Sequence, residues 1–306
     1  MSATATRCAT SHPQFLTLNG RRLFALQIEP TGPCHGAVLY LPPFAEEMNR
    51  CRSHVVAQAR AMAATGLRCL LLDPFGTGES DGRISDANWQ LWLDDAIAAT
   101  RWLAAIGPQP ITVWGLRTGA LLACDVAASA QVQVSQLLLW QPVVDGKLFI
   151  NQYLRLRIAS QMVSATERET TEQIRSRLAA GEVIEVAGYP LTGSMADSIG
   201  ARQLHGRGLP TSTRVAWLEV VAKAEQPMLP ASRRVLDALL AQGLPVRSST
   251  VACPMIWQLH ERADAPALVA ATLALLQAPQ ALDPPTAAAR GPGAVPAAAA
   301  SAQHQA

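Results

Sequence analysis

The stretch from Ile111 to Ala120 constrains the fold of this chain more than any other. It reads Ile-Thr-Val-Trp-Gly-Leu-Arg-Thr-Gly-Ala, so a short apolar segment leads into two glycines that flank Arg117. The apolar segment is typical of a buried strand, and the small residues that continue to Ala130 favour a helix that packs closely on a sheet. The pattern therefore predicts a strand, a sharp turn with Arg117 at its apex, and a helix.

Apolar runs of strand length alternate with helical patterns along most of the chain. Asn19-Gly20 supplies the positive φ angles of a tight turn and predicts an opening hairpin. The alternation is typical of the α/β class, with a mostly parallel sheet, right-handed crossovers and helices on both faces. We expect strands at Phe15–Leu18, Leu23–Ile28, Ala37–Leu41, Arg68–Leu72, Ile111–Trp114, Gln136–Trp140, Arg214–Val221 and Val246–Val251. We expect helices at Met48–Thr65, from a cap at Asp86 to Leu103, at Ala120–Ala130, Ser232–Leu240 and Ala265–Leu276.

Two regions depart from this alternation of strands and helices. Residues 146–208 contain an amphipathic, charge-rich stretch, and we interpret them as a helical cap inserted into a domain that spans residues 1–278. Residues 279–306 are mostly Pro, Ala and Gly with hardly any large apolar side chains. Such a composition buries too little apolar surface to fold, so we expect this tail to be disordered.

The turn from Asp73 to Gly82 connects the chain to a known fold. Its sequence resembles the DxxGxGxS segment of α/β-hydrolases, and Gly115-Leu-Arg-Thr-Gly119 resembles their GxSxG nucleophile elbow. The resemblance implies an α/β-hydrolase fold in which Arg117 occupies the position of the nucleophilic serine. A guanidinium stays protonated and has no usable lone pair, so Arg117 is not itself a nucleophile.

A narrower resemblance rests on four segments, PPFAEEMN, GLRTGALLA, LLLWQPVVDGK and WLEVV. Together they resemble the exosortase A system-associated hydrolase 2 family, from about Phe15 to Leu276. Membership implies a bacterial setting linked to exosortase protein sorting and exopolysaccharide production, with exosortase-system proteins as candidate partners. It implies no substrate.

The fold also implies where a catalytic acid and base belong. In chain order they follow the nucleophile, which points to Glu225 after the WLEVV segment and His260 before the last helix. The histidine is about one residue out of register, so Trp257 and Gln258 are alternatives for its place. Asp145 is an alternative acid. The simpler interpretation, an exposed His260 and a solvated Glu225, is slightly favoured.

Replacement nucleophiles are scarce. Thr118 begins the helix, Cys124 lies two turns into it as a small hydrophobe, and Ser80 suits a structural hydrogen bond. The loop after Leu41 lacks the usual His-Gly, yet the fold implies that Phe44 or Ala45 would give a backbone N–H to an oxyanion hole.

Arg117 needs a partner, since an uncompensated buried charge costs about 3–5 kcal/mol. Glu46 and Glu47, on the loop that faces the elbow in this fold, are the natural carboxylates. Two hypotheses follow. In the first, the chain is a pseudo-hydrolase that binds an anionic ligand or a partner through Phe44, Glu46, Glu47, Arg117 and Thr118. In the second, it is an active hydrolase or acyltransferase on a small ester or thioester, with water activated by His260 or Glu46.

Composition and charge bear on the partners, cofactors and location of the protein. The 25 basic and 23 acidic residues are spread along the chain, which argues against a nucleic-acid partner. The six cysteines form no CxxC pair, so neither a metal site nor a disulfide framework is indicated, and we expect no cofactor. An apolar signal-peptide core and a membrane-length apolar run are both missing, and we expect a cytoplasmic protein without a membrane span.

Overall fold

An eight-stranded sheet organises the chain, as the computed structural model shows for residues 9–107, 109–161, 169–259, 261 and 263–277. The strand order is β1-β2-β4-β3-β5-β6-β9-β10. β2 runs antiparallel to both of its neighbours, and the six strands from β4 to β10 pair in parallel. The bounds are β1 Thr10–Leu18, β2 Arg21–Glu29, β3 Gly36–Leu41, β4 Leu67–Leu72, β5 Ile111–Leu116, β6 Gln136–Trp140, β9 Arg214–Val221 and β10 Val246–Ala252.

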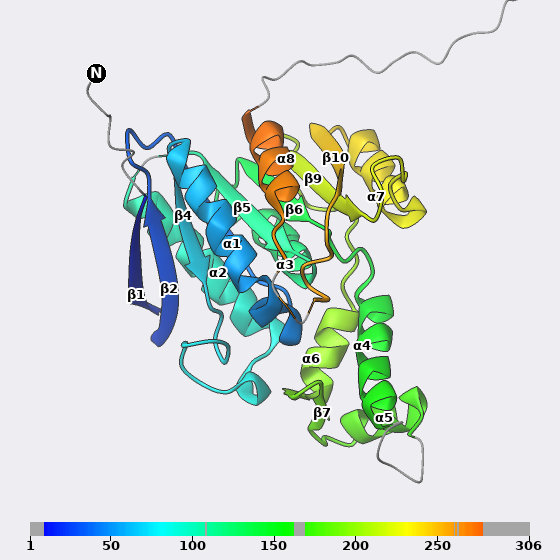
Figure 1. Ribbon diagram of the computed structural model, residues 1–306. Coiled ribbons are helices and arrows are strands. Elements are labelled where there is room, and N and C mark those ends of the chain that lie inside the picture. The colour runs from blue at the N-terminus through cyan, green and yellow to red at the C-terminus, as the bar shows by residue number, and fades with distance from the viewer. Residues whose placement is uncertain (1–8, 108, 162–168, 260, 262, 278–306) are drawn as a thin grey trace, which may run out of the picture. The chain divides into compact units, whose positions relative to one another are not determined.

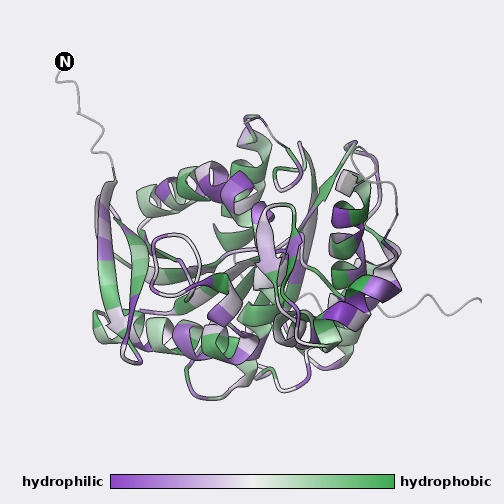
Figure 2. Cartoon of the chain, turned by 90° about the horizontal axis from the view of Figure 1, so that it is seen from below, coloured by the Kyte–Doolittle hydropathy of each residue, from purple (hydrophilic) through white to green (hydrophobic). Residues whose placement is uncertain are grey.

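Helices cover both faces of the sheet (Figure 1). α1 (Glu46–Ala64) and α8 (Pro266–Gln277) pack on one face; α2 (Trp89–Ala105), α3 (Thr118–Ala128) and α7 (Pro230–Ala241) pack on the other. Strands buried on both faces read as continuous apolar runs, and all six residues of β3 are buried. Along the helices, hydrophilic and hydrophobic residues alternate (Figure 2), as expected when one side packs on a sheet. The predicted α/β class is confirmed.

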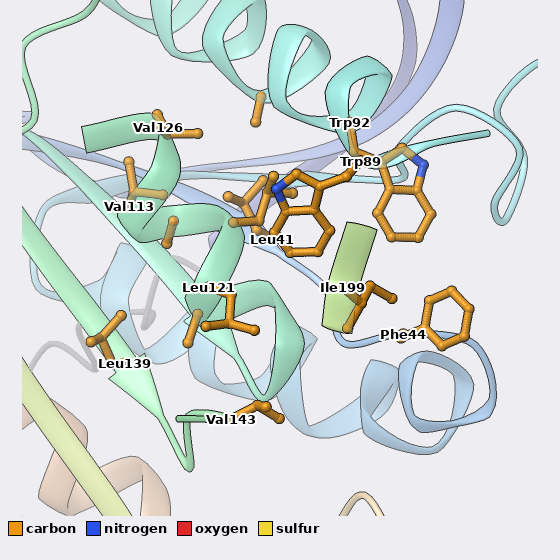
Figure 3. Packing of buried hydrophobic residues seen from close by; sticks show 14 of the residues in the cluster. Leu41, Phe44, Trp89, Trp92, Val113, Leu121, Val126, Leu139, Val143 and Ile199 are labelled. Carbon is orange, nitrogen blue, oxygen red and sulfur yellow. The ribbon is translucent and has the colours of Figure 1, made fainter. Parts of the chain in front are cut away.

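The larger of the two cores lies between the sheet and α2 and α3. Leu41, Val113 and Leu139 project from three adjacent strands toward Trp89 and Leu121 (Figure 3). The small residues of α3 let its backbone approach β5, in agreement with the prediction for this segment. This close packing fixes the turn between β5 and α3, where Arg117 lies.

In its described residues, 141–161 and 169–213, the segment between β6 and β9 forms three helices and a hairpin. Its bounds are α4 Gly146–Gln161, α5 Thr171–Ala179, β7 Ile184–Val186, β8 Tyr189–Leu191 and α6 Gly193–Gly200. The sequence predicted helices here but not the β7–β8 hairpin, whose strands are only three residues long. The tail from residue 279 lies outside the described residues.

One carboxylate ties this segment to the helices behind the sheet. Asp125 on α3 accepts a hydrogen bond from Trp89 Nε1 on α2 at 2.7 Å, and another from Arg202 Nε at 2.8 Å. The Arg202 guanidinium also lies over the Trp89 ring, 5.5 Å from its centroid. Asp125 therefore links α2, α3 and the chain that follows α6.

The expected cap at Asp86 is wrong. Asp86 ends a short 3-10 turn (Ile84–Asp86), and the cap of α2 is Asn88, whose side-chain oxygen accepts the N–H of Leu91 at 2.9 Å. Asp and Asn are both good N-cap residues, so the sequence pattern could not separate two candidates that lie two positions apart. Among the described residues, no helix has the length and apolar character needed to cross a bilayer.

We predict that Asp125→Ala lowers the free energy of unfolding by about 2 kcal/mol, because the buried Trp89 N–H loses its acceptor. Urea unfolding followed by circular dichroism measures the change. Asp237→Ala, at an exposed position of α7, is the matched control and should leave the midpoint unchanged. Equal midpoints for the two variants would show that Asp125 is not an anchor.

Candidate functional site

The loops that follow β3, β5, β6, β9 and β10 meet at one edge of the sheet, because these strands are parallel and adjacent. In open α/β sheets, ligands bind at the carboxyl ends of the strands. Arg117 follows β5 directly and has φ +54° and ψ −116°, a conformation that non-glycine residues rarely adopt. Ala45, after β3, has nearly the same angles, φ +53° and ψ −124°. Backbone strain of this kind clusters at functional sites.

The two elbow glycines are required by close backbone approach. A Cβ on Gly115 would lie 2.4 Å from the carbonyl oxygen of Gly119, and a Cβ on Gly119 would lie 2.2 Å from that of Leu41. The turn around Arg117 is therefore tight at both of its glycines.

Arg117 is held by an ion pair and two aromatic rings. Its Nη2 and Nε lie 3.1 and 3.2 Å from Oε1 of Glu47. The guanidinium carbon lies 5.3 Å from the ring centroid of Trp257 and 6.0 Å from that of Phe149. The side chains of Arg117 and Glu47 are only 16% and 20% exposed. The charge at the elbow is thus partly shielded from water and compensated by a carboxylate and two π faces.

Glu47 keeps an altered proton affinity despite this pairing. Burial raises the pKa of its carboxyl above the ordinary value of 4.5, and the charge and hydrogen bonds of Arg117 offset the shift only in part. Glu47 is therefore the carboxyl group at the elbow that is poised to hold a proton more readily than a solvated glutamate.

The structure corrects the role expected for Glu46. Glu46 forms an ion pair with Arg50, one turn along the same helix, rather than with Arg117. With 3.6 residues per turn, adjacent positions on a helix point about 100° apart, so only one of the two glutamates faces the elbow. That residue is Glu47.

One of the two expected oxyanion donors, the N–H of Phe44, is already bonded. The backbone N–H of Phe44 donates to the hydroxyl of Thr118 at 2.8 Å, and both residues are buried. The Phe44 ring also packs edge-on against Tyr153 of α4, with centroids 5.4 Å apart. Thr118 thus supplies the acceptor oxygen that an oxyanion would supply in an acyl-transfer enzyme.

Of the acid and base candidates, the structure describes Glu225, Asp145 and Trp257. Glu225 is exposed in the loop after β9, which agrees with the simpler interpretation of a solvated acid. His260 lies outside the described residues, whereas Trp257 of the same loop covers Arg117. Asp145 accepts the N–H of Leu148 at 2.9 Å in the first turn of α4, a local hydrogen bond that is typical of Asp at a turn.

The surroundings of Cys124 and Ser80 do not favour a role as nucleophile. Burial raises the pKa of the Cys124 thiol to about 12, so the thiolate is scarce near neutral pH. The Ser80 hydroxyl donates to the carbonyl oxygen of Asp73 at 2.5 Å and accepts the N–H of Phe24 at 2.8 Å. Within the described part of the chain, no three His, Cys, Asp or Glu side chains lie together in a way that would hold a metal ion.

A cleft of about 570 Å³ opens beside Arg117, and we call it the Arg117 cleft. Its wall includes Arg117, Gln141, Phe149, His205, Ser232 and Arg234. Its volume is in the range of small-molecule sites, and it lies at the carboxyl edge of the sheet. A second cleft of about 580 Å³, lined by Ile111 and Arg101, lies at the opposite edge, where β5 begins.

Sequence reasoning missed the part that α4 plays. Phe149 and Tyr153 are four positions apart, and their rings stack with centroids 6.1 Å apart. This spacing puts them on one side of a helix, which is a signal that the sequence does contain. What the sequence does not contain is the direction in which that side faces.

Solved structures share this architecture at low identity. Est1E from Butyrivibrio proteoclasticus, solved with ferulic acid bound, is 17% identical, with a TM-score of 0.58 over 86% of this chain and 96% of its own. XC6422 from Xanthomonas campestris, described as an α/β serine hydrolase without a lid, is 15% identical, with a TM-score of 0.52 over 87% and 91%. The α/β hydrolase GrgF from Penicillium sp. sh18 is 16% identical, with a TM-score of 0.53 over 79% and 90%. No family model and no curated protein matches the sequence.

We predict that Gly119→Ala lowers the free energy of unfolding by about 2–3 kcal/mol, because the added Cβ would collide with the Leu41 carbonyl. Thermal or urea unfolding measures the loss. Gly32→Ala is the matched control, since its Cβ would have no neighbour within 4 Å. Similar unfolding curves for both variants would contradict the close approach inferred at the elbow.

We also predict a pH-dependent effect of Glu47→Gln. Because the folded-state pKa of Glu47 is raised, the folded protein binds this proton more tightly than the unfolded chain does. Ionisation of Glu47 therefore removes stability as the pH rises from about 4.5 through the raised pKa, and the variant lacks this loss. We expect the unfolding free energy of the wild type, measured from pH 4 to 8, to fall relative to that of the variant as the pH rises. The opposite trend would mean that attraction to Arg117 outweighs burial.

Proposed function

Because the chain has the α/β-hydrolase fold but carries Arg117 where the nucleophile of that fold lies, we propose that it is a pseudo-hydrolase that binds a small anionic ligand. The observation that supports this most directly is the set of contacts around Arg117. Glu47, Phe149 and Trp257 stabilise a permanent cation at the position from which a serine would attack. The bond from the Phe44 N–H to Thr118 further disfavours an oxyanion hole in the usual form.

Binding is supported by the cleft beside the elbow. Arg117 uses Nε and Nη2 for Glu47, and its Nη1 has no bonding partner within the described residues. A guanidinium with a free edge favours carboxylate or phosphate oxygens. An anionic ligand in the Arg117 cleft therefore has a donor available without breaking the ion pair.

The resemblance of the PPFAEEMN loop and the arginine-bearing elbow supports a setting for this function. We place the protein in the cytoplasm of a bacterium, acting with an exosortase and exopolysaccharide system, with proteins of that system as its partners. This setting rests on those sequence segments alone.

A second candidate is an active hydrolase or acyltransferase on a small ester or thioester, working without a serine. One observation favours it: the raised pKa of Glu47 is a property of general bases that activate water. Turnover that is lost in Glu47→Gln would establish this function in place of binding alone.

We predict that the purified protein is not labelled by a fluorophosphonate probe and does not turn over a panel of p-nitrophenyl esters. Arg117→Ser should remain inactive, because the Phe44 N–H is bonded to Thr118 and Trp257 covers the elbow. Arg117→Ala is the matched control for loss of the ion pair without a hydroxyl. Esterase activity that appears in the serine variant and not in the alanine variant would show a triad that is intact apart from its nucleophile.

A further inference from the structure

The Arg117 cleft contains a second group of hydrogen-bond donors, separate from the elbow. They come from the start of α7, where Leu229 is the N-cap and Pro230 the first helical residue. Ser232, in this first turn, is only 4% exposed, lines the cleft, and its hydroxyl has no hydrogen-bond partner within the described residues. Backbone N–H groups in the first turn of a helix also have no acceptor in the helix. Because Ser232 lines the cleft, its hydroxyl and the free N–H groups beside it can donate to a molecule that binds there.

Two further side chains add donors to the same wall. Arg234 lies on the next turn of α7, and within the described residues no carboxylate pairs with it. His205 accepts the backbone N–H of Arg207 on its Nδ1 at 3.0 Å, so the neutral ring carries its proton on Nε2 as a donor.

Two of the acceptor side chains in the cleft wall already receive a backbone N–H. Asp145 accepts the N–H of Leu148 in the first turn of α4, and the Gln141 side-chain oxygen accepts the N–H of Val220 at 2.7 Å. The Asp145 carboxylate is the one negatively charged side chain among the described residues of the lining, against the two guanidinium groups of Arg117 and Arg234. The balance of charge in the cleft is therefore positive, and its complement is a group of acceptor oxygens with negative charge.

The rest of the wall is apolar. Leu148 on α4 and Leu229 before α7 both line the cleft and are 48% and 49% exposed, and Phe149 and Val235 lie beside them. Half-exposed leucines on two helix starts, at the rim of one cleft, favour a ligand with an apolar part that removes them from water.

From this arrangement we propose that the Arg117 cleft binds a small organic carboxylate whose carboxylate group is held by Ser232, the first turn of α7 and Arg234, and whose apolar chain or ring packs on Leu148, Leu229 and Phe149. The inference rests on the proposed function in one respect, that the ligand is bound and not cleaved. It adds the chemical class of the ligand and a recognition site on α7 that is distinct from the elbow.

Isothermal titration calorimetry with sodium octanoate tests the proposal on the full chain. Octanoate should bind at least about ten-fold more tightly than octanamide, which has the same chain without the charge, and than acetate, which has the charge without the chain. Equal affinities for octanoate and octanamide, or for octanoate and acetate, would overturn it.

Variants on one helix locate the site. Arg234→Gln and Ser232→Ala should each weaken octanoate binding by about ten-fold, because each removes a donor to a charged group. Arg233→Gln is the matched control: it is exposed on the same turn, carries the same charge and does not line the cleft. Equal losses of octanoate affinity in Arg233→Gln and Arg234→Gln would show that the effect comes from surface charge alone, and would contradict the proposed site.

Hydrolysis of p-nitrophenyl octanoate by the wild type separates the two proposals. Such turnover would refute the pseudo-hydrolase function, whereas the α7 site would still stand or fall on the octanoate affinities of the same variants.

Discussion

The ion pair between Arg117 and Glu47 is the interaction on which the rest of the site depends. A guanidinium at the tip of a strained turn, surrounded by packed helices, is destabilising unless a carboxylate pairs with it and aromatic rings pack on it. Glu47 provides the first, and the Phe149 and Trp257 rings provide the second. These residues come from α1, α4 and the loop after β10, so one charge draws three separate segments to the carboxyl edge of the sheet.

The elbow shows which parts of the fold are fixed by backbone geometry and which by side-chain chemistry. Gly115 and Gly119 are required by contacts with Gly119 and Leu41 that any residue at position 117 would leave in place. The two glycines therefore form a structural joint between β5 and α3 that does not depend on the side chain at position 117. The same glycines carry information about the fold and none about the reaction.

Much of the fold could be predicted from the sequence because the central strands, such as β3 and β6, are buried along their whole length and read as continuous apolar runs. The α/β class and nearly all of the central strands follow from that periodicity. The β7–β8 hairpin could not be predicted, since three-residue strands are too short to show a period of two. At the site, a carboxylate partner for Arg117 was expected, but the choice between Glu46 and Glu47 depends on the rotation of α1, which neighbouring sequence does not encode. Ser232 and Arg234 were missed for a similar reason: nothing local to α7 indicates that its first turn opens on a cleft.

Helix α4 contributes two rings to two different parts of the site. Phe149 lies over the guanidinium of Arg117, while Tyr153, one turn further along, packs on Phe44, whose N–H donates to Thr118. Leu148, at the rim of the cleft, directly precedes Phe149 in the same helix. Because these side chains belong to one helix, α4 contributes both to the wall of the Arg117 cleft and to the packing that surrounds the elbow, so the position of a single helix sets the shape of both.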